Sequence, residues 1–75
     1  MKFIKSGQLA KKAGVLRSTV DFYTRHGLLK VSGHTQGGYR LYNEAEALKR
    51  IKEIKKLQGE KRLTIEEIKK ELGIK

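Results

Sequence analysis

The sequence of 75 residues is long enough for one domain with a small core, and we treat residues 1–75 as a single domain. The absence of cysteine excludes disulfides and thiolate metal sites, two histidines argue against a structural zinc site, and no metal or other cofactor is expected. The net charge of +10 indicates a polyanionic partner. No apolar run approaches the ~20 residues of a membrane span, and the N-terminus lacks the apolar core of a signal peptide. We therefore expect a cytoplasmic protein.

Residues 6–27 are predicted to form two short helices joined by a tight turn. Ser6 is a good N-cap residue for the first helix, and the apolar stripe that follows ends at Gly14, where a left-handed C-cap residue is expected. A second pattern of helical spacing begins within a few residues and stops at Gly27. Two helices around a glycine-containing turn match the helix-turn-helix arrangement, although helical hairpins of other functions share the pattern.

A β-hairpin is predicted next, with strands at residues 28–31 and 39–42. Both segments are rich in β-branched, aromatic or large apolar residues, and the loop between them contains three glycines. Because side chains alternate along a strand, Arg40 and Tyr42 lie on one face and Tyr39 lies on the other. The hairpin is therefore amphipathic, with one side available to an external surface.

A third helix is predicted at about residues 43–58. Asn43 is a suitable N-cap residue, and the acidic residues of the first turn favour the positive end of the helix dipole. Apolar residues recur along one face, and Glu46 and Arg50 are expected to form an i, i+4 ion pair on the exposed side. We interpret this segment as a core helix with a solvated outer face and assign it no chemistry.

The fourth helix is predicted at about residues 64–72 from its N-terminal capping signal. Thr64 and Glu67 match a capping box, and apolar residues on either side of Thr64 fit a hydrophobic staple. The polar turn at residues 58–62 is short, so this helix should fold back onto the third one. The third and fourth helices together form a closing pair.

The charge is distributed unevenly along the chain. Residues 1–42 contain eight basic residues and a single acid, Asp21, whereas residues 43–75 contain ten basic and seven acidic residues. An uncompensated cationic half favours binding to nucleic acid or to an anionic membrane. No segment combines a strongly basic face with a broad apolar one, which argues against the membrane. A soluble basic protein adapted to high temperature would have a similar composition.

Three segments in this order, LAKKAGV at 9–15, FYTRHGLL at 22–29 and GGYRLY at 37–42, resemble the DNA-binding domain of the MerR family of bacterial regulators. The resemblance covers nearly the whole chain. It implies a mainly α fold, a winged helix-turn-helix with a two-stranded hairpin wing and a closing pair of helices. The helix-turn-helix would occupy about 6–27 and the wing about 28–42. The second helix would enter the DNA major groove, with the wing on the flanking backbone or minor groove.

The resemblance and the residue chemistry together give the candidate DNA-binding residues. Arg17, Ser18 and Thr19 begin the second helix, the end that commonly reaches base edges, and an arginine there suits a bidentate contact with guanine. Arg40 in the wing is the predicted phosphate contact, because its charged fork suits an anionic target. The full set is Lys11, Lys12, Arg17, Ser18, Thr19, Tyr23, Arg25, Tyr39, Arg40 and Tyr42.

Several candidates also have a structural interpretation. Tyr23 and Arg25 match family positions that hold the domain on the DNA backbone, but the ring of Tyr23 also lies on the apolar stripe of its helix. Ser18 could instead cap that helix. Lys11 and Lys12 could be solvated helix surface, and the wing could be a plain turn whose aromatic residues pack onto the core.

The sequence departs from the family pattern at two positions of the second helix. Leu16 stands where a capping serine or threonine is usual, so this helix could begin later, at Ser18. Asp21 stands where the family often has an arginine. Because Asp21 is four residues from both Arg17 and Arg25, an intrahelical ion pair is its expected role. A hydrogen bond from a cytosine amino group is the alternative.

The predicted function is sequence-specific double-stranded DNA binding in transcription regulation. An excisionase-like or chromosome-organising DNA-binding module is the alternative. RNA binding would need exposed aromatic residues on a sheet, for which only Tyr39 and Tyr42 qualify, and no arrangement of residues suggests an enzyme. The dimerisation helix and sensor domain that the resemblance implies lie outside these 75 residues, so we expect a monomer, or a dimer formed through other regions.

Overall fold

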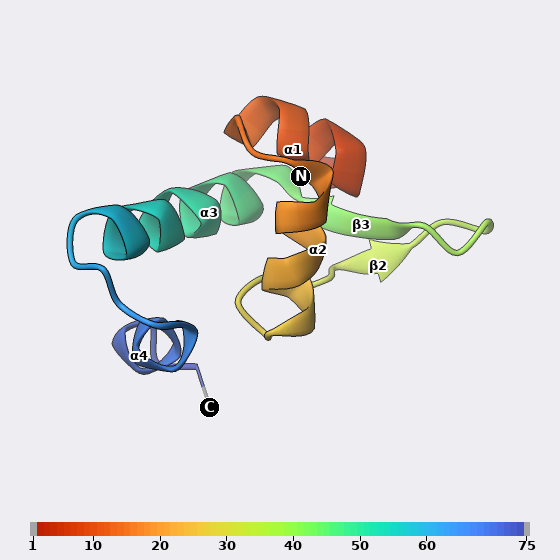
Figure 1. The fold of residues 1–75 in the computed structure, drawn as a ribbon. Helices are drawn as coiled ribbons and strands as arrows, with labels where there is room; N and C mark the ends of the chain where they lie inside the picture. Colours follow the sequence, from red (N-terminus) through yellow and green to blue (C-terminus); the bar gives the residue numbers. More distant parts are fainter. Residues whose placement is uncertain (1, 75) are drawn as a thin grey trace.

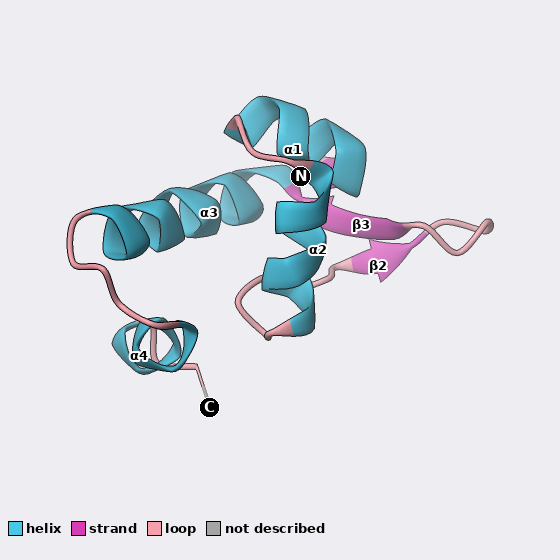
Figure 2. Cartoon of the chain, in the orientation of Figure 1, coloured by secondary structure: helices cyan, strands magenta, loops and turns pink. Residues whose placement is uncertain are grey.

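The structure, a computed structural model, describes residues 2–74, which form four helices and a three-stranded sheet (Figure 1). The fold is the mainly helical winged helix-turn-helix that the sequence predicts. Figure 2 shows the small sheet among the helices, with the hairpin of its last two strands projecting away from the body. In chain order the elements are β1 (Phe3–Lys5), α1 (Ser6–Ala13), α2 (Arg17–Arg25), β2 (Gly33–His34), β3 (Arg40–Asn43), α3 (Glu44–Gly59) and α4 (Ile65–Glu71).

The sheet has the strand order β1-β3-β2, and both strand pairs are antiparallel. The sequence pattern did not predict β1, because a three-residue strand with a single buried side chain, Ile4, offers no alternation to detect. Ile4 pairs with Tyr42 of β3, and the Glu44 N–H donates a hydrogen bond to the Lys2 carbonyl (2.9 Å). β1 therefore holds β3, the middle strand of the sheet, against the body of the domain.

The first strand of the wing lies further along the chain than residues 28–31, where the sequence predicted it. β2 comprises only Gly33–His34. Leu28 and Leu29 are buried, and both of their N–H groups donate to the Tyr23 carbonyl near the end of α2 (2.8 and 3.3 Å). The apolar run therefore closes α2 and fills the core, which leaves it unavailable for strand pairing.

α1 and α2 form the predicted helix-turn-helix, and Gly14 ends α1 with a left-handed φ of +70° that favours glycine. The N-cap residue of α1 is Lys5, one residue before the expected Ser6. α1 begins at Ser6 itself, and Lys5 occupies the cap position, with its backbone N–H donating to Oε1 of Gln8 (3.0 Å). The Gln8 side chain thus satisfies the backbone N–H of the cap residue, which is the N3 half of a capping box.

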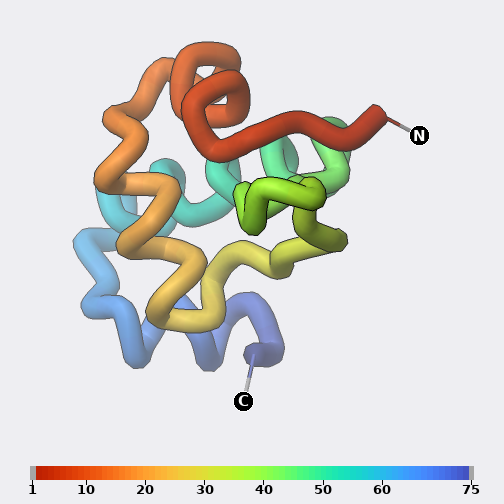
Figure 3. The backbone as a smooth tube through the Cα atoms, turned by 90° about the vertical axis from the view of Figure 1, so that its right-hand side faces the viewer, coloured from red at the N-terminus to blue at the C-terminus, as the bar shows by residue number. Residues whose placement is uncertain are grey.

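The starts of the two closing helices confirm the sequence prediction. Asn43 accepts a hydrogen bond from the Glu46 N–H (3.1 Å), and Thr64 forms a capping box with Glu67 through bonds of 3.3 and 3.0 Å. Figure 3 shows α4 turning back toward the segment that follows α2. Ile68 of α4 is fully buried in that position, so the last helix closes the core.

One hydrophobic core connects the helix-turn-helix, the sheet and the closing helices. Its buried members from α2, Val20 and Tyr23, lie on one side of that helix, which leaves the Arg17 and Ser18 side chains exposed to solvent. The buried apolar residues are Ile4, Leu9, Ala10, Val20, Tyr23, Leu28, Leu29, Tyr42, Ala47, Ile51, Ile54 and Ile68.

Candidate nucleic-acid interface

The first turn of α2 presents three candidate residues. α2 starts at Arg17 and not at Ser18, after an extended Leu16 (φ −76°, ψ 151°) that provides no side-chain cap. The Thr19 N–H donates to the Leu16 carbonyl (3.0 Å), which closes the first turn through the backbone alone. Ser18 makes no capping hydrogen bond within residues 2–74, and its side chain is exposed, as is that of Arg17. Both side chains are therefore free to meet a ligand.

A groove of about 510 Å³ lies between the start of α1, the first turn of α2 and the wing. It brings Arg17 and Arg40 to the same face of the molecule, although they come from different elements. Four of its described lining residues are cationic and none is acidic. Such a groove suits an anionic ligand, because nothing within it repels negative charge. The lining residues are Lys5, Ser6, Gly7, Gln8, Lys11, Arg17, Tyr39 and Arg40.

The tip of the wing is a tight turn closed by its own backbone. The Gly38 N–H donates to the Thr35 carbonyl (3.0 Å), and the Thr35 N–H donates to the Tyr39 carbonyl (2.9 Å). Gly38 has a φ of +83°, as expected for a hairpin loop that ends in a left-handed residue. The Lys5 ammonium lies 4.8 Å from the centre of the Tyr39 ring, while Tyr39 remains 54% exposed. The ring is thus positioned by Lys5 and still open to a ligand.

Arg40 is held by an acid of α2. Its Nη1 lies 2.6 Å from Oδ1 of Asp21, and Nη2 of Arg25 lies 3.0 Å from Oδ2 of the same carboxylate. The sequence predicted an intrahelical pair with Arg17 or Arg25, and Arg25 is the partner. Arg25 holds the pKa of the Asp21 carboxyl below its usual value, with help from Arg40 and against partial desolvation. One carboxylate therefore links the wing to α2.

The structure corrects the expectation for Tyr42 and restricts that for Tyr23. Tyr42 is fully buried, and its hydroxyl lies 2.7 Å from Oγ1 of Thr24, so a DNA contact would require the side chain to leave the core. Tyr23 is 4% exposed and donates its hydroxyl hydrogen to Oε1 of Gln58 (3.0 Å), and burial raises its pKa. Both hydroxyls are hydrogen-bonded within the domain, so Tyr42 leaves the interface, whereas the DNA contact of Tyr23 stays a prediction that requires its hydroxyl to exchange partners.

The two lysines of α1 have different surroundings. Lys11 lines the groove. Nζ of Lys12 lies 2.7 Å from Oε2 of Glu44, which also pairs with Lys2 at 3.7 Å. The hydrogen bond raises the pKa of Lys12 and lowers that of Glu44. Lys11 therefore belongs to the cationic groove, whereas Lys12 fastens α1 to the start of α3.

The N-terminal segment contributes to the groove in a way that the sequence pattern does not predict. Lys5 lies there because β1 pairs with β3, and the first turn of α1 follows directly. Since no strand was predicted at Phe3–Lys5, nothing placed Lys5 beside the wing. The only available signal was the excess of basic residues in the first half of the chain.

The comparison with protein families gives one match that covers almost the whole chain. The family described as MerR HTH family regulatory protein matches residues 4–73. The chain belongs to this family. The mercuric resistance operon regulatory protein of Bacillus cereus is 40% identical over 74 residues, which are 99% of this chain and 54% of that protein. ZntR of Escherichia coli K12 is 39% identical over 49 residues, or 65% of this chain and 34% of ZntR.

Solved structures of MerR-family regulators have the same fold. PbrR691 of Ralstonia metallidurans CH34, solved with lead(II), has a TM-score of 0.80 and 37% identity over 93% of this chain and 53% of its own. HiNmlR, a MerR family regulator that lacks the sensor domain and was solved on promoter DNA, has a TM-score of 0.77. At 23% identity over 92% of this chain and 53% of its own, HiNmlR shows likeness of fold alone. The chain spans about half the length of the first of its curated relatives.

Two other features, a membrane-spanning helix and a metal-binding cluster, are not found in the described part of this MerR-family chain. Between residues 2 and 74 no helix has the length and apolar character to cross a membrane. The same residues contain no cluster of three His, Cys, Asp or Glu side chains that could hold a metal ion. Mercury resistance and lead(II) binding are attributed only to the two relatives above.

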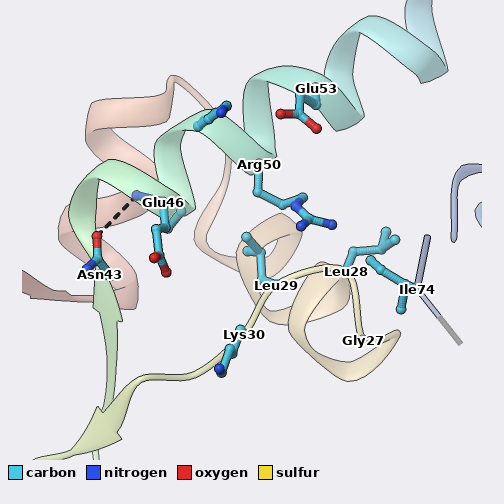
Figure 4. A pocket seen from close by; sticks show the side chains of 11 residues that line it. Gly27, Leu28, Leu29, Lys30, Asn43, Glu46, Arg50, Glu53 and Ile74 are labelled. Carbon is cyan, nitrogen blue, oxygen red and sulfur yellow. Dashed lines mark hydrogen bonds between the residues drawn. The ribbon is translucent and has the colours of Figure 1, made fainter. Parts of the chain in front are cut away.

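A second hollow, of about 480 Å³, lies between α3 and the loop that follows α2 (Figure 4). Figure 4 shows Arg50 reaching from α3 toward Leu28. The expected ion pair between Glu46 and Arg50 does not form, and within residues 2–74 Nη1 of Arg50 is buried without a hydrogen-bond partner. The lining carries both basic and acidic side chains. Its mixed charge makes it a poorer match to a polyanion than the groove beside the wing.

Proposed function

We propose that this chain binds double-stranded DNA as the DNA-reading part of a transcription regulator that acts in the cytoplasm. The observation that carries the proposal is the cationic groove, which gathers Lys5, Lys11, Arg17 and Arg40 from four elements without an acid among its described lining residues. Membership of the MerR family supports it, because the relatives are regulatory proteins. HiNmlR, which has the same fold, was solved on promoter DNA.

The exposed first turn of α2 is the part that we expect to read the bases. An α-helix fits the major groove, which is about 12 Å wide, and residues at the start of such a helix reach base edges. Arg17 is exposed and unpaired within residues 2–74, so its guanidinium can donate two hydrogen bonds to guanine. Ser18 and Thr19 follow it and supply hydroxyl groups for bases or phosphates.

The wing is the part that we expect to hold the flanking backbone. Arg40 carries the planar cation, and the exposed Tyr39 lies beside it. Contacts of this kind release counterions from DNA, so log K should fall with log salt by about 0.9 for each phosphate neutralised. The groove itself provides Lys5 and Lys11 for the same purpose.

The test begins with selection of bound sequences from a random duplex library. On the best selected duplex, we expect Arg17→Ala to reduce discrimination at one base pair by about 1–3 kcal/mol. Arg40→Ala should instead weaken binding to every duplex similarly and lower the salt slope by about 0.9. Arg62→Ala, in the connection between α3 and α4 and outside the groove, is the matched arginine control and should bind like wild type.

Wild-type affinity in both groove variants at about 0.1 M salt, where phosphate contacts contribute strongly, would show that the groove is not the interface. Absence of duplex binding by the wild-type chain would refute the function itself. Footprinting the selected sequence distinguishes regulation from an excisionase-like or chromosome-organising role. Sites in promoters support regulation, whereas repeated sites at phage or transposon ends support excision.

A further inference from the structure

Asp21 is the sole acid among the first 42 residues, and both of its oxygens are occupied by arginines. Oδ1 accepts from Arg40 of β3 at 2.6 Å, and Oδ2 accepts from Arg25 at the end of α2 at 3.0 Å. Arg40 also lines the cationic groove. The Asp21 carboxylate thus occupies the N–H donors of Arg25 and Arg40 that could otherwise bind a phosphate.

A carboxylate and a phosphate both accept hydrogen bonds from the N–H groups of a guanidinium. Each presents oxygens to its planar set of N–H donors, and a donor that is directed at one anion is unavailable to the other. The side chains of Asp21 and Arg40 are 40% and 37% exposed, and that of Arg25 is 72% exposed. Water therefore screens both ion pairs, which makes them weak enough to exchange with an incoming anion.

We propose that Asp21 competes with DNA phosphates for Arg40 and Arg25, and thereby lowers the affinity of this chain for duplexes of unrelated sequence. Its carboxylate must release one or both arginines before the wing can neutralise the backbone. A ligand that offers only phosphates meets this cost in full. A duplex that also satisfies the exposed first turn of α2 meets the same cost but offsets it through base contacts. Asp21 therefore lowers the affinity for every duplex, and only a well-matched sequence remains tightly bound. This inference rests on the proposed function.

The chain contains a matched control for the charge of Asp21. Glu44 also holds two cations, Lys12 at 2.7 Å and Lys2 at 3.7 Å. None of these three residues lines the groove. Replacing either acid by its amide removes one negative charge and releases two cations, but only Asp21→Asn releases a cation into the groove.

The experiment measures binding of a fluorescent random-sequence duplex over a range of salt concentrations, for wild type, Asp21→Asn and Glu44→Gln. We expect Asp21→Asn to bind roughly three- to tenfold more tightly at about 0.1 M salt, with a salt slope steeper by about 0.9 for each arginine released. Glu44→Gln should keep the wild-type slope. In an Arg40→Ala background, Asp21→Asn should gain less, because one of the two arginines that it would release is gone.

Every outcome decides between competition and its alternatives. Weaker binding by a folded Asp21→Asn variant would show that the carboxylate only positions the wing, and unchanged binding would show that it does not restrain the arginines. An equal gain for Glu44→Gln would reduce the effect to net charge. Each of these results overturns the inference while wild type still binds DNA. If wild type binds no duplex, the proposed function fails and this inference fails with it.

Discussion

The three tyrosines of this domain differ in what their hydroxyl groups meet. The hydroxyls of Tyr23 and Tyr42 bond to Gln58 and Thr24 inside the domain, and both rings belong to the core. Tyr39 instead contacts Lys5 with its ring and is 54% exposed, and its hydroxyl has no hydrogen-bond partner within residues 2–74. Of the three, Tyr39 has the large exposed surface. The other two set the position of α2 against α3 and β3.

We expect Tyr42→Phe to lower the free energy of unfolding by about 1 kcal/mol, the net value of one buried hydrogen bond. The loss should not be larger, because Thr24 still donates to the Val20 carbonyl (2.8 Å) and keeps one partner. Urea denaturation of both proteins measures the difference. Tyr39→Phe is the control and should unfold like wild type, since its hydroxyl makes no hydrogen bond within residues 2–74 and the residue is exposed. Equal losses in the two variants would contradict the difference in burial.

The sequence predicts contacts within one element better than contacts between elements. Helical spacing offered Arg17 and Arg25 as partners of Asp21, and Arg25 is one of them. The second partner, Arg40, comes from β3, and only the packing of the wing against α2 brings it near. Strand alternation likewise placed Arg40 and Tyr42 on one face but could not decide that this face turns toward α2.

At the scale of elements, helix ends were predictable where a short local pattern determines them. Asn43 and the capping box of Thr64 each act over three residues, so the sequence contains the whole signal. The strands β1 and β2 have three and two residues, which is too short for a periodic pattern. Their positions depend on pairing with β3, a tertiary contact that no local pattern specifies.

The turn at the tip of the wing gives a prediction for one glycine. Gly38 has a φ of +83°, and a Cβ added there would meet no atom within 4 Å. We therefore expect Gly38→Ala to cost about 1–2 kcal/mol from backbone strain alone, without a steric clash. Gly59→Ala, at the end of α3, also adds a methyl group to open space but has no positive φ.

Gly59→Ala, the control, should be neutral or should raise the free energy of unfolding by up to ~1 kcal/mol, because alanine has a higher helix propensity than glycine. Urea unfolding of the two variants against wild type gives both values. Similar changes for Gly38→Ala and Gly59→Ala would show that the left-handed turn does not constrain the wing.

At the scale of the whole molecule, two acids determine which cations are paired and which remain unpaired. Asp21 and Glu44 are each bonded to two cations, which leaves Lys5, Lys11 and Arg17 without an ion pair within residues 2–74. These three residues line the groove. The uneven charge that the sequence revealed is therefore concentrated further by folding, because the nearby acids are directed at other cations.

The same acidic contacts determine how stability should depend on pH. The pKa of Asp21 is lowered chiefly by Arg25, that of Glu44 by Lys12, and that of Glu67 by the backbone N–H at the cap of α4. A carboxyl whose pKa is lower in the folded than in the unfolded chain stabilises the fold above the unfolded pKa, which is about 4. That contribution is lost as pH falls through the folded pKa.

We expect the urea midpoint to be nearly constant between about pH 7 and pH 5 and to decrease below about pH 4, where these carboxyls take up protons. The triple variant Asp21→Asn, Glu44→Gln, Glu67→Gln should be less stable at neutral pH and should lose less stability on acidification. The difference between the two profiles is the informative quantity, because protonating any carboxyl also increases the net positive charge and its repulsion. Parallel profiles would mean that the three contacts add nothing to stability, and that their geometry is not maintained in solution.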